Sequence, residues 1–112
     1  MLCNLVYHEV PGEPSPLGYI NDLRPAEKAK VFHQLEVLQQ TPIPQWPPKW
    51  VSILEDKIWE LKSGDHRILF FLHTESIVVV HAVRKRARTL RRSDIKLAKR
   101  RRGDYVHEFG QD

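Results

Sequence analysis

The chain has 112 residues, of which 41% are hydrophobic and 29% are charged, and a formal net charge of +4. This length and composition predict one folded domain over residues 1–112 and exclude an intrinsically disordered chain. The longest apolar runs, 68–72 and 77–80, are far too short to span a bilayer, so we expect a cytoplasmic protein with no membrane partner. The single cysteine, Cys3, can neither form an internal disulfide nor supply a CxxC metal site.

The first 23 residues predict a strand and a short helix. Residues 2–9 are rich in β-forming side chains and are followed by Pro11-Gly12, a pattern typical of a strand that ends in a turn. Ser15-Pro16 then has the pattern of a helix start, with a hydroxyl at the cap and a proline in the first turn. We therefore expect a short helix over residues 17–23.

A second helix is expected over residues 25–40. Val31, Leu35 and Leu38 recur at helical spacing, so this helix should place one side against an apolar surface. Residues 41–50 contain four prolines and two tryptophans, a composition that excludes a regular helix or a central strand. They predict either an ordered loop anchored by aromatic side chains or a polyproline II stretch.

Three strands and a C-terminal helix are predicted for the rest of the chain. Residues 57–62 alternate between two faces, whereas residues 66–73 and 77–85 have near-continuous apolar centres, as strands covered on both faces do. Residues 91–109 predict a closing helix, with Ser93 as a candidate cap. The order β-α-α-β-β-β-α predicts an α+β domain.

Basic residues are concentrated near the end of the chain. Residues 1–83 contain 7 Lys and Arg against 10 Asp and Glu, whereas residues 84–102 contain 11 Lys and Arg against a single acid, Asp94. A cluster of this density attracts polyanions by neutralising phosphates, without specifying a sequence. Nucleic acid is therefore the expected partner, and a solvated basic helix or a surface that docks onto an acidic protein is the alternative.

Four segments together resemble a known family. They are IWELK at 58–62, HRILFF at 66–71, VHAVRK at 80–85 and KRRRGDY at 99–105. In order and spacing they resemble the phage Gp49-like and HigB-like branch of the RelE/ParE toxin superfamily, and the resemblance extends from about Val6 to Tyr105. It implies a RelE-like fold, with a small antiparallel-centred sheet, two N-terminal helices on one face and a basic C-terminal helix.

The resemblance also implies an activity and partners. Toxins of this branch belong to type II toxin–antitoxin pairs, and the implied function is a metal-independent endoribonuclease that cleaves mRNA on the ribosome, uses no cofactor and inhibits translation. The implied antitoxin is encoded next to the toxin and carries a helix-turn-helix DNA-binding domain. ParE-like members share the scaffold but inhibit DNA gyrase, so gyrase inhibition and non-catalytic nucleic-acid binding are the alternatives.

Cleavage of this kind sets chemical requirements for the site. The ribose 2′-oxygen attacks the adjacent phosphorus, negative charge develops on the phosphorane oxygens, and the 5′-oxygen leaves. Without a metal ion, the protein must supply fixed cations and groups that accept and donate a proton. By the resemblance, Arg67 corresponds to the arginine that contacts the scissile phosphate, and Arg84 and Lys85 are the next cations. The alternative for Arg67 is an ion pair with Glu60 on the neighbouring strand.

Three further residues are candidates for catalysis. Glu60 is expected either to accept the 2′ proton or to orient Arg67. His81 is a candidate general acid or base, because histidine titrates near neutral pH, but it lies in an apolar run where a structural role is the alternative. Tyr105 occupies a recurrent position of the family and is expected either to stack on a base or to pack in the interior.

Eight further Lys and Arg residues are expected to contact the RNA backbone. These residues are Lys62, Arg86, Arg88, Arg91, Arg92, Lys99, Arg100 and Arg101. No metal site is expected, because the six histidines show no HxxxH or HExxH spacing and the carboxylates form no DxD-like group. The sequence also has no glycine-rich phosphate loop and no Gly-x-Ser-x-Gly elbow, which excludes nucleotide hydrolysis and acyl chemistry.

Overall fold

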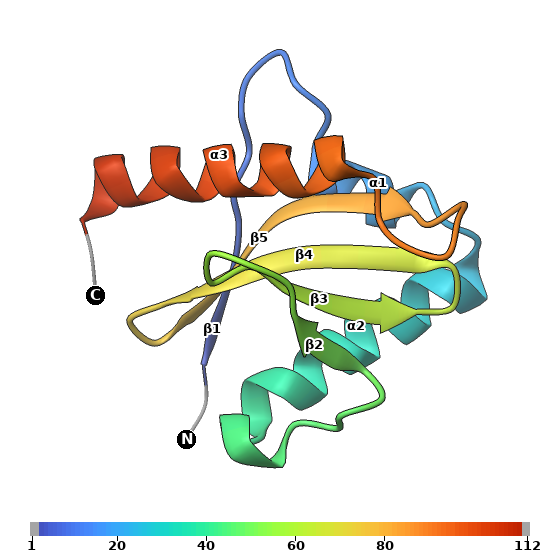
Figure 1. The fold of residues 1–112 in the computed structure, drawn as a ribbon. Helices are drawn as coiled ribbons and strands as arrows, with labels where there is room; N and C mark the ends of the chain where they lie inside the picture. Colours follow the sequence, from blue (N-terminus) through green and yellow to red (C-terminus); the bar gives the residue numbers. More distant parts are fainter. Residues whose placement is uncertain (1–2, 111–112) are drawn as a thin grey trace.

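A five-stranded sheet organises the protein, whose computed structural model describes residues 3–110 (Figure 1). The strands lie in the order β1-β5-β4-β3-β2, with β1 parallel to β5 and the other neighbours antiparallel. Their bounds are β1 Asn4–Tyr7, β2 Val51–Ile53, β3 Trp59–Ser63, β4 His66–His73 and β5 Ser76–Arg84. The sheet is therefore mixed, with four contiguous antiparallel strands and one parallel pair at its edge.

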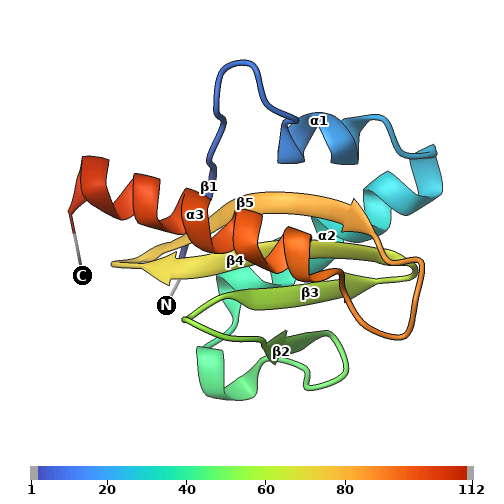
Figure 2. The same ribbon diagram turned by 45° about the horizontal axis from the view of Figure 1, so that its top comes forward.

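Helices cover both faces of this sheet (Figure 2). They are α1 Pro16–Asn21, α2 Pro25–Gln40 and α3 Arg92–Phe109, and a short 3-10 helix, Ile43–Gln45, follows α2. The apolar cluster beneath α1 and α2 contains Ile68 and Phe70 of β4, whereas the cluster beneath α3 contains Leu69 and Phe71. Successive β4 side chains thus alternate between two covered faces, which explains why this strand is apolar throughout. The predicted placement of the helices is confirmed.

The predicted α+β class is confirmed, and the strands differ from the prediction in two places. Val51–Ile53 forms an additional edge strand, β2, which pairs with β3. A strand of three residues directly after a proline-rich loop is too short to show an alternating pattern. The strand predicted over residues 2–9 is limited to Asn4–Tyr7, and Leu2 lies outside the described residues.

The two predicted helix caps have different outcomes. Ser15 caps α1 as predicted, because its Oγ accepts a hydrogen bond from the Gly18 N–H at 2.8 Å. At the start of α3 the cap position is held by Arg91 rather than by Ser93, and no side chain caps the first turn. The first turn of α3 is tied to the sheet instead by a hydrogen bond between Asp94 and a β5 histidine.

The proline-rich loop is anchored by an aromatic side chain, as predicted. Trp46 is buried, and its Nε1–H donates to the carbonyl oxygens of Leu38 and Thr41 at 3.0 and 2.9 Å. Its ring meets those of Trp59 and Phe70 edge to face. These contacts fix the chain between α2 and β2.

A β-bulge in β5 decides which side chains at the end of this strand face which helix. The register of β5 against β4 shifts at Val80, which is an extra residue in the pairing. Val80 packs beneath α3 and the next residue, His81, hydrogen-bonds to α3, whereas Ala82 packs beneath α1 and α2. Alternation beyond the bulge therefore turns Arg84 toward α1 and Lys85 toward α3.

A buried arginine of α3 holds this bulge. The Arg101 side chain is fully enclosed, and its Nη1 donates to the carbonyl oxygen of Val80 at 2.7 Å. Its Nη2 donates to the Glu13 carboxylate at 3.1 Å and to the Pro14 carbonyl at 3.2 Å, which ties the loop before α1 to α3. This enclosed position gives Arg101 a structural role and opposes the predicted RNA contact, which stays a prediction.

Candidate nucleic-acid interface

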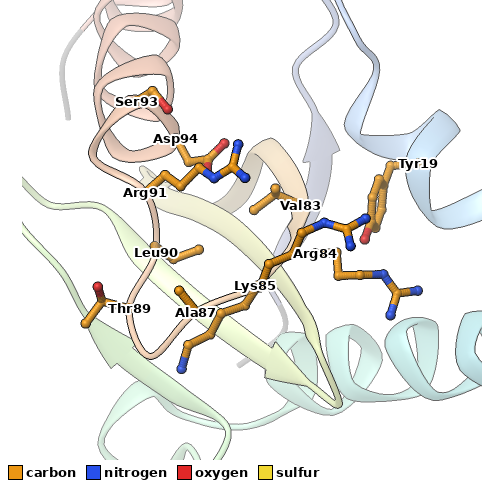
Figure 3. A pocket seen from close by; sticks show the side chains of 11 residues that line it. Tyr19, Val83, Arg84, Lys85, Ala87, Thr89, Leu90, Arg91, Ser93 and Asp94 are labelled. Atoms are coloured by element: carbon orange, nitrogen blue, oxygen red, sulfur yellow. The ribbon is translucent and has the colours of Figure 1, made fainter.

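The end of β5, the loop that follows it and the first turn of α3 enclose a cavity of about 410 Å³, hereafter the first cavity (Figure 3). It is lined by Tyr19, Val83, Arg84, Lys85, Arg86, Ala87, Thr89, Leu90, Arg91, Ser93 and Asp94. Four of these side chains are cationic and one, Asp94, is acidic. The lining therefore carries a net positive charge at neutral pH.

Acidic partners engage the cations of the first cavity only weakly. Nη1 of Arg84 lies 3.7 Å from Oδ2 of Asp65, and both side chains are exposed. Lys85, Arg86 and Arg91 form no ion pair with any residue in the range 3–110. The backbone of Lys85 is held, because its N–H donates to the Asp65 carbonyl at 2.7 Å. In Figure 3 its side chain points away from that of Arg84, as the alternation after the bulge requires.

A second cavity of about 300 Å³ adjoins the first. It is lined by Leu54, Glu55, Glu60, Lys85, Arg88, Thr89, Leu90 and Ile95. Lys85, Thr89 and Leu90 line both cavities. The half-buried side chain of Lys85 therefore borders two neighbouring cavities.

Arg67 forms the ion pair with Glu60 that the sequence offers as its alternative role. Its Nε lies 3.8 Å from Oε2 of Glu60, and its Nη1 donates to the carbonyl oxygens of Gly64 and His66 at 2.7 and 2.9 Å. The hydroxyl of Ser52 also donates to Glu60, at 3.0 Å. Glu60 borders the second cavity, but Arg67 lines neither of the two cavities. A contact between Arg67 and phosphate stays a prediction.

His81 and Asp94 form a hydrogen-bonded pair in the wall of the first cavity. Nε2 of His81 lies 2.9 Å from Oδ1 of Asp94. His81 is buried, whereas Asp94 belongs to the lining. An ionised carboxylate only accepts hydrogen bonds, so Nε2 carries the proton of this contact. The pair connects the predicted acid–base histidine to the cavity through a carboxylate that sequence reasoning did not select.

Tyr105 lies in the interior beneath α3. It is buried, and its ring lies 4.5 to 5.5 Å from the ring centroids of His8, Phe71, His73 and Phe109. These contacts show the packing role that was its alternative expectation. The enclosed ring presents little surface on which a base can stack.

Acidic residues from distant parts of the chain engage most of the α3 cations. Arg92 and Lys99 lie 2.6 and 2.8 Å from the carboxylate of Glu55, in the turn between β2 and β3. The hydrogen bond from Arg92, followed by that from Lys99, lowers the pKa of Glu55 to about 2. Arg100 pairs with Glu13 in the loop before α1. Much of the charge that the sequence assigns to an RNA-contacting helix is thus already paired within the protein.

The predicted RNA-contacting residues consequently divide into two groups. Those with an acidic partner are Arg92, Lys99, Arg100 and Arg101. Those that form no ion pair within residues 3–110 are Lys62, Arg86, Arg88 and Arg91, and the last three are exposed. Three of these four, Arg86, Arg88 and Arg91, lie in the loop between β5 and α3, whereas Lys62 lies on β3.

A hydrogen-bonded chain of three side chains leads from the first cavity into the protein. The Tyr19 hydroxyl lies 2.8 Å from Nδ1 of His66, and Nε2 of His66 lies 3.2 Å from Oε2 of Glu27. Burial raises the pKa of Tyr19, and the charge of Arg84 opposes this shift. Sequence reasoning missed this chain because Tyr19 and Glu27 lie 47 and 39 positions from His66, so no local motif links them.

Residues 3–110 contain no group of three or more His, Cys, Asp or Glu side chains arranged to hold a metal ion. None of the helices within the same range has the length and apolar character that crossing a membrane requires. The polar groups that line the two cavities include cations, carboxylates and the Tyr19 hydroxyl.

Comparison with known proteins identifies the family. No curated protein matches the chain. The model of the family described as Phage derived protein Gp49-like (DUF891) matches residues 18–103, which extend from α1 into α3 and include both walls of the first cavity. The family is one of RelE/HigB-like toxins, and a toxin of a toxin–antitoxin pair has an antitoxin as its partner. Because the match covers well over half of the chain, the protein belongs to the phage-derived Gp49-like family of toxins.

Proposed function

We propose that this toxin is a metal-independent endoribonuclease that cleaves mRNA on the ribosome and thereby inhibits translation. The observation that carries the proposal is the first cavity, where Lys85, Arg86 and Arg91 have no ion-pair partner within residues 3–110 and surround a space bordered by proton-transfer groups. Such cations bind a phosphate without first breaking an internal ion pair. A cavity with this lining suits a phosphodiester better than an apolar ligand.

In the proposed site, Lys85 stabilises the charge that develops on the phosphorane oxygens. Its backbone is held by the hydrogen bond to Asp65 and its side chain lines both cavities, so the attachment point of the cation is fixed before RNA binds. Arg84 contacts the same phosphate from the α1 side. Arg67 holds Glu60 at the second cavity, and we assign these two residues a positioning role beside Lys85.

The His81–Asp94 pair performs one of the two proton transfers of the reaction. When His81 is an imidazolium, the pair holds one proton more than a neutral imidazole and a carboxylate. Asp94 can pass this proton to the 5′-oxygen as the P–O bond breaks, which leaves His81 as a neutral imidazole. Asp94 lines the cavity and His81 lies directly behind it, so the pair acts on the cavity as one unit. Charge on the leaving oxygen is thereby neutralised without a metal ion.

The loop between β5 and α3 carries the proposed path of the RNA backbone. The unpaired loop cations Arg86, Arg88 and Arg91, together with Lys62 on β3, supply contacts to phosphates on both sides of the cleavage position. We further propose that the antitoxin carries a helix-turn-helix domain and covers this loop. The protein then acts on ribosome-bound mRNA only when the antitoxin is absent.

The test is to add the purified protein to translating ribosomes and to map the 5′ ends of the transcripts. We expect new ends at positions in phase with the codons, because the decoding site holds the mRNA in one register. Intact transcripts would overturn the proposal. A parallel gyrase reaction on plasmid identifies the alternative, since loss of supercoiling activity there, with intact mRNA, points to a ParE-like inhibitor.

A second prediction concerns how the protein holds RNA. In the double variant Arg86→Ala/Arg88→Ala, affinity for a non-cleavable RNA should fall, and the slope of log affinity against log salt should decrease by about 0.7 to 1 for each lost phosphate contact. The matched control is Arg92→Ala/Arg100→Ala, which removes the same charge from exposed positions that are already paired with Glu55 and Glu13. We expect this control to change the slope much less.

Binding measured by fluorescence anisotropy over a salt series checks this difference. Equal slopes for the two double variants would contradict the assignment of RNA contacts to the loop. If the loop variant instead keeps its RNA affinity and loses antitoxin protection in cells, the loop is an antitoxin-docking surface only.

A further inference from the structure

A proton-transfer chain that the proposed function does not use borders the first cavity on its α1 side. Tyr19 lines the cavity beside Arg84 (Figure 3), and its hydroxyl lies 2.8 Å from Nδ1 of the buried His66. The two rings also pack edge to face, with centroids 5.7 Å apart. On the other side of His66, the carboxylate of Glu27 lies 3.2 Å from Nε2. A group at the cavity surface is thus linked through a buried imidazole to a carboxylate.

The chemistry of these three groups assigns the direction of the hydrogen bonds. The Glu27 carboxylate only accepts, so Nε2 of His66 must donate to it. A neutral imidazole that donates at one nitrogen accepts at the other, so the Tyr19 hydroxyl donates to Nδ1. The lone pairs of the Tyr19 oxygen are then left to accept a hydrogen bond from a hydroxyl group in the cavity. This arrangement is oriented for moving a proton from the cavity toward His66.

The neighbouring charges favour proton transfer from the cavity toward His66. The hydrogen bond from His66 is the main cause that lowers the pKa of Glu27, so this carboxylate is ionised at neutral pH and stabilises a positive charge on His66. Burial raises the pKa of Tyr19, so its phenol does not ionise alone and passes on its proton only as it gains another.

We propose that Tyr19 is a catalytic residue of the first cavity and that, backed by His66 and Glu27, it takes the proton of the ribose 2′-hydroxyl. The inference rests on the proposed function and names its base. The 2′-hydroxyl transfers its proton to the Tyr19 oxygen while the Tyr19 proton moves to Nδ1 of His66. The 2′-oxygen forms its bond to phosphorus, the bond from phosphorus to the 5′-oxygen breaks, and the His81–Asp94 pair protonates that oxygen. The products are a 2′,3′-cyclic phosphate and a 5′-hydroxyl.

The positions of the two proton-transfer groups fit an in-line displacement. In such a reaction the attacking and leaving oxygens lie on opposite sides of phosphorus, so the base and the acid must also lie on opposite sides of the phosphate. Tyr19 is on the α1 side of the cavity, Asp94 is on the α3 side, and Arg84 projects from β5 between them (Figure 3). A phosphate held by the cations of the cavity is then flanked by both groups.

The test compares Tyr19→Phe with Tyr7→Phe. Both tyrosines are half-buried and pack against the same apolar cluster, but only Tyr19 lines the first cavity, so the pair controls for loss of a phenol oxygen. With RNA in single-turnover reactions at saturating protein, Tyr19→Phe should lower the cleavage rate by about 100-fold or more. Its affinity for RNA blocked by a 2′-O-methyl group should stay near the wild-type value, and Tyr7→Phe should cleave at the wild-type rate.

A double variant tests whether the hydrogen bond from Tyr19 to His66 serves catalysis or only structure. If Tyr19 and His66 act as one unit, the double variant Tyr19→Phe/His66→Gln should be no slower than Tyr19→Phe alone. A folded Tyr19→Phe protein that cleaves at the wild-type rate would overturn the inference and leave the proposed function standing. Wild-type protein that fails to cleave any RNA would instead remove the proposed function. Should His66→Gln fail to fold, the comparison of Tyr19→Phe with Tyr7→Phe still decides the outcome.

Discussion

Replacing Lys85 by alanine is expected to lower the rate of RNA cleavage by about 100- to 1,000-fold, the loss typical of one preorganised donor to a developing oxyanion. The reason is that its side chain lines both cavities and forms no ion pair within residues 3–110, while its backbone N–H is held by the Asp65 carbonyl. Single-turnover cleavage of a short mRNA on programmed ribosomes measures the effect. The melting temperature should change little, because no internal ion pair is removed.

Lys30→Ala is the matched control for this prediction. Lys30 is exposed on α2, on the face of the sheet opposite α3, and its loss removes the same charge without touching either cavity. We expect it to cleave at the wild-type rate. Lys85→Arg should recover part of the activity, since it keeps the charge but changes the donor geometry. Equal rates for Lys85→Ala and Lys30→Ala would remove Lys85 from the site.

Replacing Arg101 by methionine is expected to lower the free energy of unfolding by about 3 kcal/mol. The change leaves the Val80 carbonyl and the enclosed end of the side-chain site without their donors, and an unpaired buried polar group is costly. In a domain of this size such a loss lowers the melting temperature by roughly 10 °C or more. Thermal unfolding followed by circular dichroism measures it.

Arg100→Met tests whether burial, rather than charge, explains this loss. Arg100 is the preceding residue and also pairs with Glu13, but its side chain is 53% exposed, against 1% for Arg101. Exposed ion pairs contribute little to stability, so this variant should unfold close to the wild-type temperature. A similar fall in both variants would show that the contact with Glu13, and not the bond to the bulge, stabilises α3.

Most helices and strands, and the family, could be predicted from the sequence because the patterns that indicate them are local. The helix over residues 25–40 begins at a proline and keeps one apolar side, and the structure gives it these bounds. β4 and β5 were recognisable from near-continuous apolar runs, which arise because both faces of the sheet are covered. The short β2 was missed, since three residues carry no readable period.

The ion-pair partners of the α3 cations could not be predicted from the local sequence. Arg92, Lys99, Arg100 and Arg101 were assigned to RNA, because residues 84–102 contain only Asp94 as an acid. Glu13 and Glu55 lie far from α3 in the chain and reach it only after folding. Burial of Arg101 likewise depends on packing that spacing does not reveal. The proposed RNA contacts are consequently fewer on the helix and are centred on the loop before it.

The sequence by itself determined the α+β class, the resemblance to the Gp49-like toxins and the concentration of cations between residues 84 and 102, because these follow from local pattern and composition. Only the tertiary structure decided which cations are unpaired and which groups stand beside them. The extra residue Val80 changes the alternation of β5, so that Arg84 faces Tyr19 on one side and Lys85 faces the second cavity on the other. A one-residue shift of register reverses the faces of all the side chains that follow, and it is set by packing against β4 and by the Arg101 bond rather than by any local motif.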